Sequence, residues 1–155
     1  MPRSLAPIPA QAQIVATNGT ILDFFRLRWQ QLVDGFSQAP TLASLSKLAQ
    51  AAALVTTTLW TTRSKGTYRI TIYVHITQAA TTSSSVQVTI GWIENGSAVT
   101  KTFAAVTGNT TQTTDGQSYE VPADNASGLT VSTTYASVGA TPMQYRLEAS
   151  VEQCV

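Results

Sequence analysis

The residues with catalytic chemistry in this 155-residue chain are few and lie far apart in the sequence. His75 is its one histidine and Cys154 its one cysteine. A cysteine–histidine pair needs both side chains within hydrogen-bond reach, and nothing local brings these two together. His75 alternates with apolar residues, which is typical of the outer face of a strand. We interpret His75 as a structural or surface residue and Cys154 as a small apolar residue at a strand end.

The acidic residues offer no stronger case for catalysis or for metal binding. Glu148 and Glu152 lie on the same face of one predicted strand, and glycoside hydrolysis needs a pair of carboxylates. Beside Arg146, however, two outward carboxylates are more typical of a solvated surface. Asp115 and Asp124 precede turn-forming residues and do not build a calcium ligand series, and no Cys/His metal spacing is present. The sequence predicts no enzyme, no metal site and no cofactor.

Aromatic side chains leave carbohydrate binding open as a function. Tryptophan and tyrosine rings can stack on sugar rings, and Asn, Gln and Thr can hydrogen-bond sugar hydroxyls. Trp92 shares its strand face with apolar residues, which favours a place in the core. Tyr73 and Tyr119 are further candidates for stacking. Trp60 ends a predicted strand, and we expect it to be the better candidate for contact with a ligand or partner.

The composition favours a β-protein with a structural or binding role over an enzyme. Charged residues make up 11% of the chain, against about 25% in ordinary soluble domains. Threonine contributes 25 residues, and its β-branched side chain favours pleated surfaces. The formal net charge is +1 and no basic patch is visible, which argues against nucleic acid as a partner. No apolar run approaches the length of a membrane span, and the first residues do not predict export.

Residues 1–19 are predicted to form an extended N-terminal arm. Pro2, Pro7 and Pro9 exclude a regular helix there, and the segment ends at the turn dipeptide Asn18-Gly19. Isolated apolar residues are spaced along the arm as anchors for attachment to a neighbouring surface: Leu5, Ile8, Ile14 and Val15.

Residues 20–37 are predicted to form one amphipathic helix. Its apolar residues recur at spacings of three and four, which is a short heptad seam: Leu22, Phe25, Trp29, Leu32 and Phe36. A lone helix cannot bury such a face on itself. The helix would either dock on the sheet of its own chain or join copies of itself around a symmetry axis.

Residues 38–53 are a connector that contains the first strand, and residues 54–155 are predicted to form a β-sandwich. The pattern over 39–53 fits both a helix and a strand, and we favour a strand over about 45–50. Alternation is clear over 68–76, 86–92 and 143–151, and Asn95-Gly96 is a hairpin turn. Shorter strands are expected near 99–106, 118–121 and 129–135. The fold class is therefore mainly β, an antiparallel sandwich or jelly roll preceded by an arm and a helix.

Several motifs together resemble a domain that recurs in structural proteins of tailed bacteriophages. The resemblance covers roughly residues 45–153 and rests on these segments: Gly66-Thr67-Tyr68-Arg69-Ile70, Ile76–Ser85, Thr89-Ile90-Gly91-Trp92, Thr107–Thr111 and Tyr135–Tyr145. Residues Asn18–Arg26 and Trp29–Leu32 resemble the attachment segments that precede such domains. The Gly-x-Tyr strand entry is similar in architecture to trimeric jelly rolls of the C1q and tumour-necrosis-factor type. The resemblance implies no catalytic residues.

We therefore expect a bacteriophage virion structural protein, a homotrimer in the tail or fibre attached through its N-terminus with the β-domain outward. An alternative is a capsid decoration protein on the phage head, and a second alternative is a soluble carbohydrate-binding module. The expected partners are copies of the chain, other virion proteins and a host-surface glycan or receptor. The expected location is the virion, after synthesis in the host cytoplasm.

Overall fold

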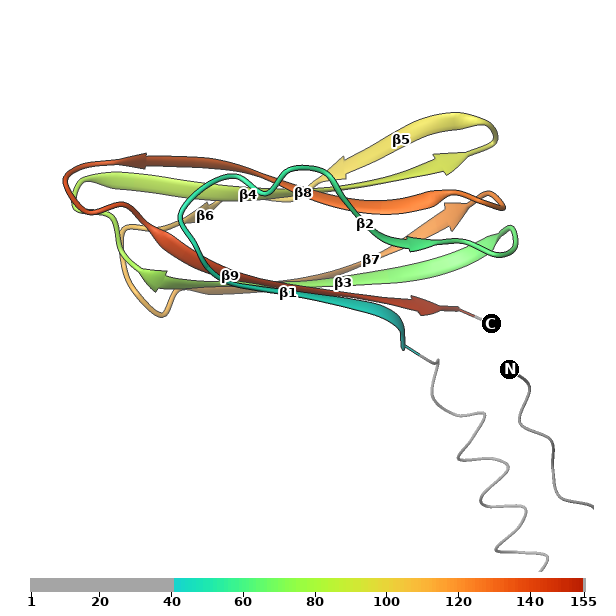
Figure 1. The fold of residues 1–155 in the computed structure, drawn as a ribbon, viewed down its shortest axis with the longest axis horizontal. Helices are drawn as coiled ribbons and strands as arrows, with labels where there is room; N and C mark the ends of the chain where they lie inside the picture. The colour runs from blue at the N-terminus through green and yellow to red at the C-terminus, as the bar shows by residue number, and fades with distance from the viewer. Residues whose placement is uncertain (1–40, 155) are drawn as a thin grey trace, which may run out of the picture. The chain divides into compact units, whose positions relative to one another are not determined.

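The computed structural model describes residues 41–154, which form two antiparallel β-sheets packed face to face (Figure 1). Sheet A has the strand order β1-β9-β3-β7, and sheet B has the order β2-β8-β4-β5, with β6 also pairing with β4. The strands are β1 (Thr41–Gln50), β2 (Thr57–Thr61), β3 (Gly66–Gln78), β4 (Ser83–Glu94), β5 (Ser97–Thr102), β6 (Val106–Thr107), β7 (Thr114–Ala123), β8 (Gly128–Val138) and β9 (Gln144–Gln153). The predicted antiparallel β-sandwich is confirmed, and this strand order is that of a jelly roll.

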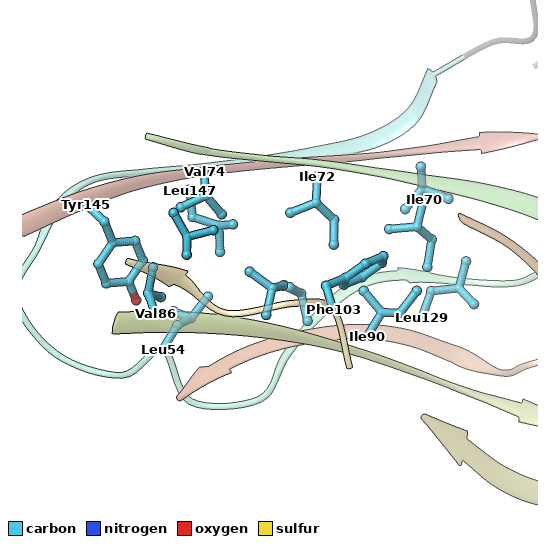
Figure 2. Close-up of a cluster of buried hydrophobic side chains, with 14 of the residues drawn as sticks. Leu54, Ile70, Ile72, Val74, Val86, Ile90, Phe103, Leu129, Tyr145 and Leu147 are labelled. Atoms are coloured by element: carbon cyan, nitrogen blue, oxygen red, sulfur yellow. The ribbon is translucent and has the colours of Figure 1, made fainter. Parts of the chain in front are cut away.

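The core lies between the two sheets and follows from the alternation in the long strands (Figure 2). On β3 every second residue from Tyr68 to Ile76 is buried, and on β4 every second residue from Val86 to Trp92 is buried. Because successive side chains of a strand point to opposite faces, one apolar set from each sheet meets at the centre. The prediction that Trp92 belongs to the core is confirmed, since its exposed fraction is 6%.

The ambiguous segment before residue 54 is a strand, not a helix. β1 spans Thr41–Gln50 and pairs antiparallel with β9, with Ser44 opposite Ser150 and Leu45 opposite Ala149. Ala49 has a φ of 50°, and the register shifts between Lys47 and Gln50. The strand begins earlier than expected because it pairs with β9 along most of its length. This pairing also decides between the helical and the strand periodicity, both of which fit the sequence.

Two other boundaries differ from the sequence-based expectation. The strand expected near 99–106 is divided into β5 and β6, and the short strand expected at 118–121 is the longer β7. The Asn95-Gly96 hairpin is confirmed, with φ values of 49° and 77° at its two residues, as a two-residue turn between right-twisted strands requires. Asp124 supports this turn, because its carboxylate accepts a 2.8 Å hydrogen bond from the Gly96 N–H.

Residues 41–154 belong to one compact unit. The arm predicted at 1–19 and the helix predicted at 20–37 lie outside the described residues, as do their anchor and seam residues. Within residues 41–154, no helix is long and apolar enough to span a membrane.

Candidate functional site

The structure separates the two residues with the most reactive side chains. His75 lies near one end of the paired part of β3, where its Nε2 is 3.0 Å from Oε1 of Gln112. Cys154 is a free thiol just beyond β9, at the other end of β3, where its backbone N–H donates to the Thr67 carbonyl. The length of β3 puts the two residues roughly 26 Å apart. Among residues 41–154, no three of His, Cys, Asp and Glu gather closely enough to hold a metal ion.

Most of the aromatic candidates are engaged in packing. Trp60 is half-buried, packs against the core and has the Arg63 guanidinium 5.4 Å from its ring centroid. Tyr119, at the edge of the sandwich, is 38% exposed, and its ring centroid lies 6.1 Å from that of Trp92 and 6.4 Å from that of Phe103. Contact of Trp60 with a ligand stays a prediction, and one face of its ring already has a cation over it. The remaining tyrosine of the set, Tyr73, lies on the outer face of sheet A, with its ring centroid 6.4 Å from that of His75.

The outer face of sheet A carries a row of hydroxyl side chains that crosses all four strands. Ser44 of β1 lies opposite Ser150 of β9, which lies opposite Thr71 of β3, which lies opposite Ser118 of β7. The Thr71 and Ser118 hydroxyl oxygens are 3.1 Å apart. We call these four residues the hydroxyl row. Because neighbouring strands are about 4.8 Å apart, the row spans roughly 14 Å.

Tyr73 stands in the next row, beside the hydroxyl row. It pairs with Glu148 of β9 on one side and with Gly116 of β7 on the other, and 36% of it is exposed. Gly116 has no side chain to cover the ring, and a Cβ built there would lie 3.8 Å from Cδ2 of Tyr73. Tyr73 therefore keeps an accessible aromatic surface beside the hydroxyls.

The β1, β9 and β3 members of these two rows line an open depression of about 330 Å³ on the outer face of sheet A. Its lining contains three members of the hydroxyl row together with the tyrosine and the glutamate of the neighbouring row: Ser44, Leu45, Ser46, Thr71, Tyr73, Glu148, Ala149 and Ser150. The volume falls in the range of small-molecule sites in proteins. A second hollow, at the edge between the sheets, has about 10 Å³ and can hold little more than one water molecule.

Charged side chains border the hydroxyl row, and both arginines among them are paired with glutamates. On one side, Nη2 of Arg69 is 2.9 Å from Oε1 of Glu120, and this hydrogen bond raises the pKa of Arg69. Glu152 lies opposite Arg69 on β9. On the other side, Arg146 donates to Glu148. The hydroxyl row itself is uncharged, between two borders of paired ions.

The outer face of sheet B differs sharply in its chemistry. The positions of β4 and β8 that alternate with buried residues hold neither a charged side chain nor an aromatic ring: Ser85, Gln87, Thr89, Gly91, Ile93, Thr130, Ser132, Thr134 and Ala136. Of the two sheet faces, the outer face of sheet A thus combines an accessible ring, hydroxyls and charges. Sequence alternation placed Thr71 and Tyr73 on an outward face, but no signal in the sequence brought Ser44 or Ser150 beside them.

The sequence matches no family model and no curated protein. Among solved structures, the chain is similar to the EclA C-terminal domain, described as a sugar-binding protein, with 12% identity, a TM-score of 0.45, and coverage of 74% of this chain and 80% of that one. It is also similar to the CBM22-1–GH10 modules of Clostridium thermocellum endo-1,4-β-D-xylanase 10B, complexed with xylohexaose, with 9% identity and a TM-score of 0.41. That match covers 71% of this chain and 21% of the xylanase chain. Likenesses of this strength carry no weight for function.

Proposed function

We propose that the β-sandwich is a carbohydrate-binding module that holds a glycan on the outer face of sheet A without catalysing a reaction on it. The observation that carries this proposal is the exposed ring of Tyr73 beside the hydroxyl row in one depression. A sugar presents an apolar ring face, which an aromatic ring can cover. It also presents hydroxyls, and serine and threonine hydroxyls can both donate to them and accept from them.

The charges around the depression support binding over catalysis. Glu148 lines the depression, but it already accepts a hydrogen bond from Arg146. With one oxygen held by this guanidinium, the carboxylate still has lone pairs that can accept hydrogen bonds from sugar hydroxyls. Glu148 is therefore assigned as an acceptor that orients the glycan, with Tyr73 as the surface on which the glycan packs.

A glycan array followed by calorimetry on the best ligand tests this function. Tyr73→Ala removes the aromatic surface, and we expect affinity to fall about tenfold or more, as for an interface anchor. Ser150→Gln fills the depression from its floor and should weaken binding to a similar extent. Ser132→Gln is the matched control, because Ser132 is an equally half-buried outward serine on a central strand of sheet B. Full binding by Tyr73→Ala and Ser150→Gln, or no binding by the parent chain, would refute the proposal.

We also propose, from the sequence alone, that the chain belongs to a bacteriophage particle as a homotrimer. The tail or fibre and the head shell are the two placements, and glycan binding by an outward β-domain suits a protein on the virion surface in either one. The proposal rests on the resemblance of residues 45–153 and on the predicted attachment arm. Immunogold labelling of purified particles with an antibody to the β-domain tests it. Label on the tail or on the head supports the corresponding placement, and unlabelled particles count against both.

A further inference from the structure

We infer that the ligand is an internal segment of a linear, neutral polysaccharide that lies along the hydroxyl row and crosses the strands of sheet A. This inference rests on the proposed function and specifies how its ligand is bound. It distinguishes a chain that passes through the site from a terminal sugar that is held end-on in a closed pocket.

The first reason is that, as far as residues 41–154 are concerned, the hydroxyl row is open at both ends. Ser44 lies on β1 and Ser118 lies on β7, and these are the two edge strands of sheet A (Figure 1). In the described part of the chain, each pairs on one side only, β1 with β9 and β7 with β3. No further strand of residues 41–154 continues the sheet to close either end. A ligand that lies along the row can therefore extend past both edge strands.

The second reason is the length of the row. It spans roughly 14 Å, estimated from the spacing of four strands, which is longer than one sugar ring. A single sugar beside Tyr73 would contact the middle of the row and leave hydroxyls unused toward both edges. Only a ligand of several linked sugars can contact Ser44 and Ser118 at the same time.

The third reason is the distribution of charge. The row carries no charge, and its borders hold the arginines Arg69 and Arg146 against the glutamates Glu120, Glu148 and Glu152. Both arginines are already engaged with glutamates of the same border. An anionic polysaccharide would meet the three carboxylates of Glu120, Glu148 and Glu152 against only two guanidinium groups, both already paired with glutamates, whereas a neutral glycan needs only the hydroxyls, the carboxylate acceptors and the ring. Charge therefore favours a neutral chain.

Calorimetry with neutral oligosaccharides of one to six units tests the inference. The probe is the best-binding of the malto-, cello-, xylo- and chito-oligosaccharide series, with polygalacturonate as the anionic comparison. Affinity should rise by about tenfold or more from the shortest to the longest members and then level off. Ser44→Gln and Ser118→Gln crowd the two ends of the row. Each should weaken binding of the longest oligosaccharide several-fold more than it weakens binding of the shortest one.

Thr100→Gln is the matched control for the two end variants, because Thr100 is an exposed hydroxyl residue on β5, an edge strand of sheet B. It should bind every length like the parent chain. Equal affinity for one sugar and for six, end variants that weaken all lengths equally, or tighter binding of polygalacturonate would each overturn the inference. If one of these results were found and glycan binding were still weakened by Tyr73→Ala, the inference would fall but the proposed glycan binding would stand. If the parent bound no glycan, both proposals would fall.

Discussion

The hydroxyl oxygens of Tyr145 and Thr133 lie 2.8 Å apart inside the sandwich and connect sheet A to sheet B. The Tyr145 hydroxyl donates to the Ala52 carbonyl at 2.9 Å, and the Leu54 N–H donates to Thr133 Oγ1 at 2.7 Å. Because the single hydroxyl proton of Tyr145 goes to Ala52, the hydroxyl of Thr133 is the donor between the two side chains. Figure 2 shows the Tyr145 ring with its oxygen directed toward Leu54. The chain crosses from β1 to β2 between residues 50 and 57, and these bonds hold that crossing in place.

Tyr145→Phe should lower the free energy of unfolding by about 1–3 kcal/mol, because it leaves buried hydrogen-bonding groups without their partner. Urea unfolding monitored by fluorescence measures the change. Tyr119→Phe is the control, since its hydroxyl makes no hydrogen bond within residues 41–154 and it should unfold near the parent midpoint. A Tyr145→Phe protein as stable as the parent would show that the crossing does not depend on this network.

The same tyrosine predicts a loss of stability at alkaline pH. Burial raises the pKa of Tyr145 above its ordinary value of 10.0. Above pH 10 the unfolded chain therefore releases this proton while the folded chain still holds it, so the folded state loses stability as pH rises toward the folded pKa. In unfolding measurements from pH 8 to 11, the stability difference between parent and Tyr145→Phe should shrink above pH 10. A constant difference over this range would contradict the prediction.

Gly108→Ala should be among the most damaging single-methyl additions to the sandwich. A Cβ at Gly108 would overlap Sδ of Met143 and Oγ of Ser84, and Met143 is fully buried. Overpacking a closed core costs about 1–3 kcal/mol, and thermal unfolding measures it. Gly66→Ala is the control, because its nearest contact would be 3.9 Å away. Equal melting temperatures for the two variants would mean that Met143 moves aside freely.

Trimerisation through the predicted helix at 20–37 is tested by light scattering on the full chain. We expect a trimer mass at micromolar concentration and a loss of about 3–5 kcal/mol of assembly stability in Trp29→Ala if that side chain is buried in the seam. Arg28→Ala changes the opposite side of the predicted helix and should assemble like the parent. A parent chain that is monomeric or dimeric disproves the trimer, and normal assembly of Trp29→Ala places the seam on another face.

Deletion of residues 1–19 should leave the thermal melt of the β-sandwich nearly unchanged. The compact unit that contains residues 41–154 includes both sheets and their core, so the arm is expected to serve attachment and not folding. Calorimetry of the truncated chain measures the melt, and copy number in purified particles measures incorporation, which should be lost. A truncated chain that fails to fold, or that joins particles at the normal copy number, would contradict this role.

Local pattern was sufficient for much of the fold. The alternation in β3 and β4 predicted which side chains are buried, because in a strand the face of each residue depends only on the parity of its position. Asn95-Gly96 predicted a hairpin because the turn needs two residues that tolerate positive φ. The burial of Trp92 followed from the same parity.

Pairing between distant strands decided the rest. Residues 41–50 fit two periodicities, and β9, about a hundred residues further along the chain, made them a strand. The candidate site has the same origin, since Ser44, Thr71, Ser118 and Ser150 are neighbours only through the registers of β1, β3 and β7 with their partners. The sequence of a strand determines on which face of the sheet a side chain lies, but not which residue of the neighbouring strand lies opposite it. That choice depends on long-range register, so the sequence alone predicted the sandwich, and the tertiary structure assembled the hydroxyl row beside Tyr73.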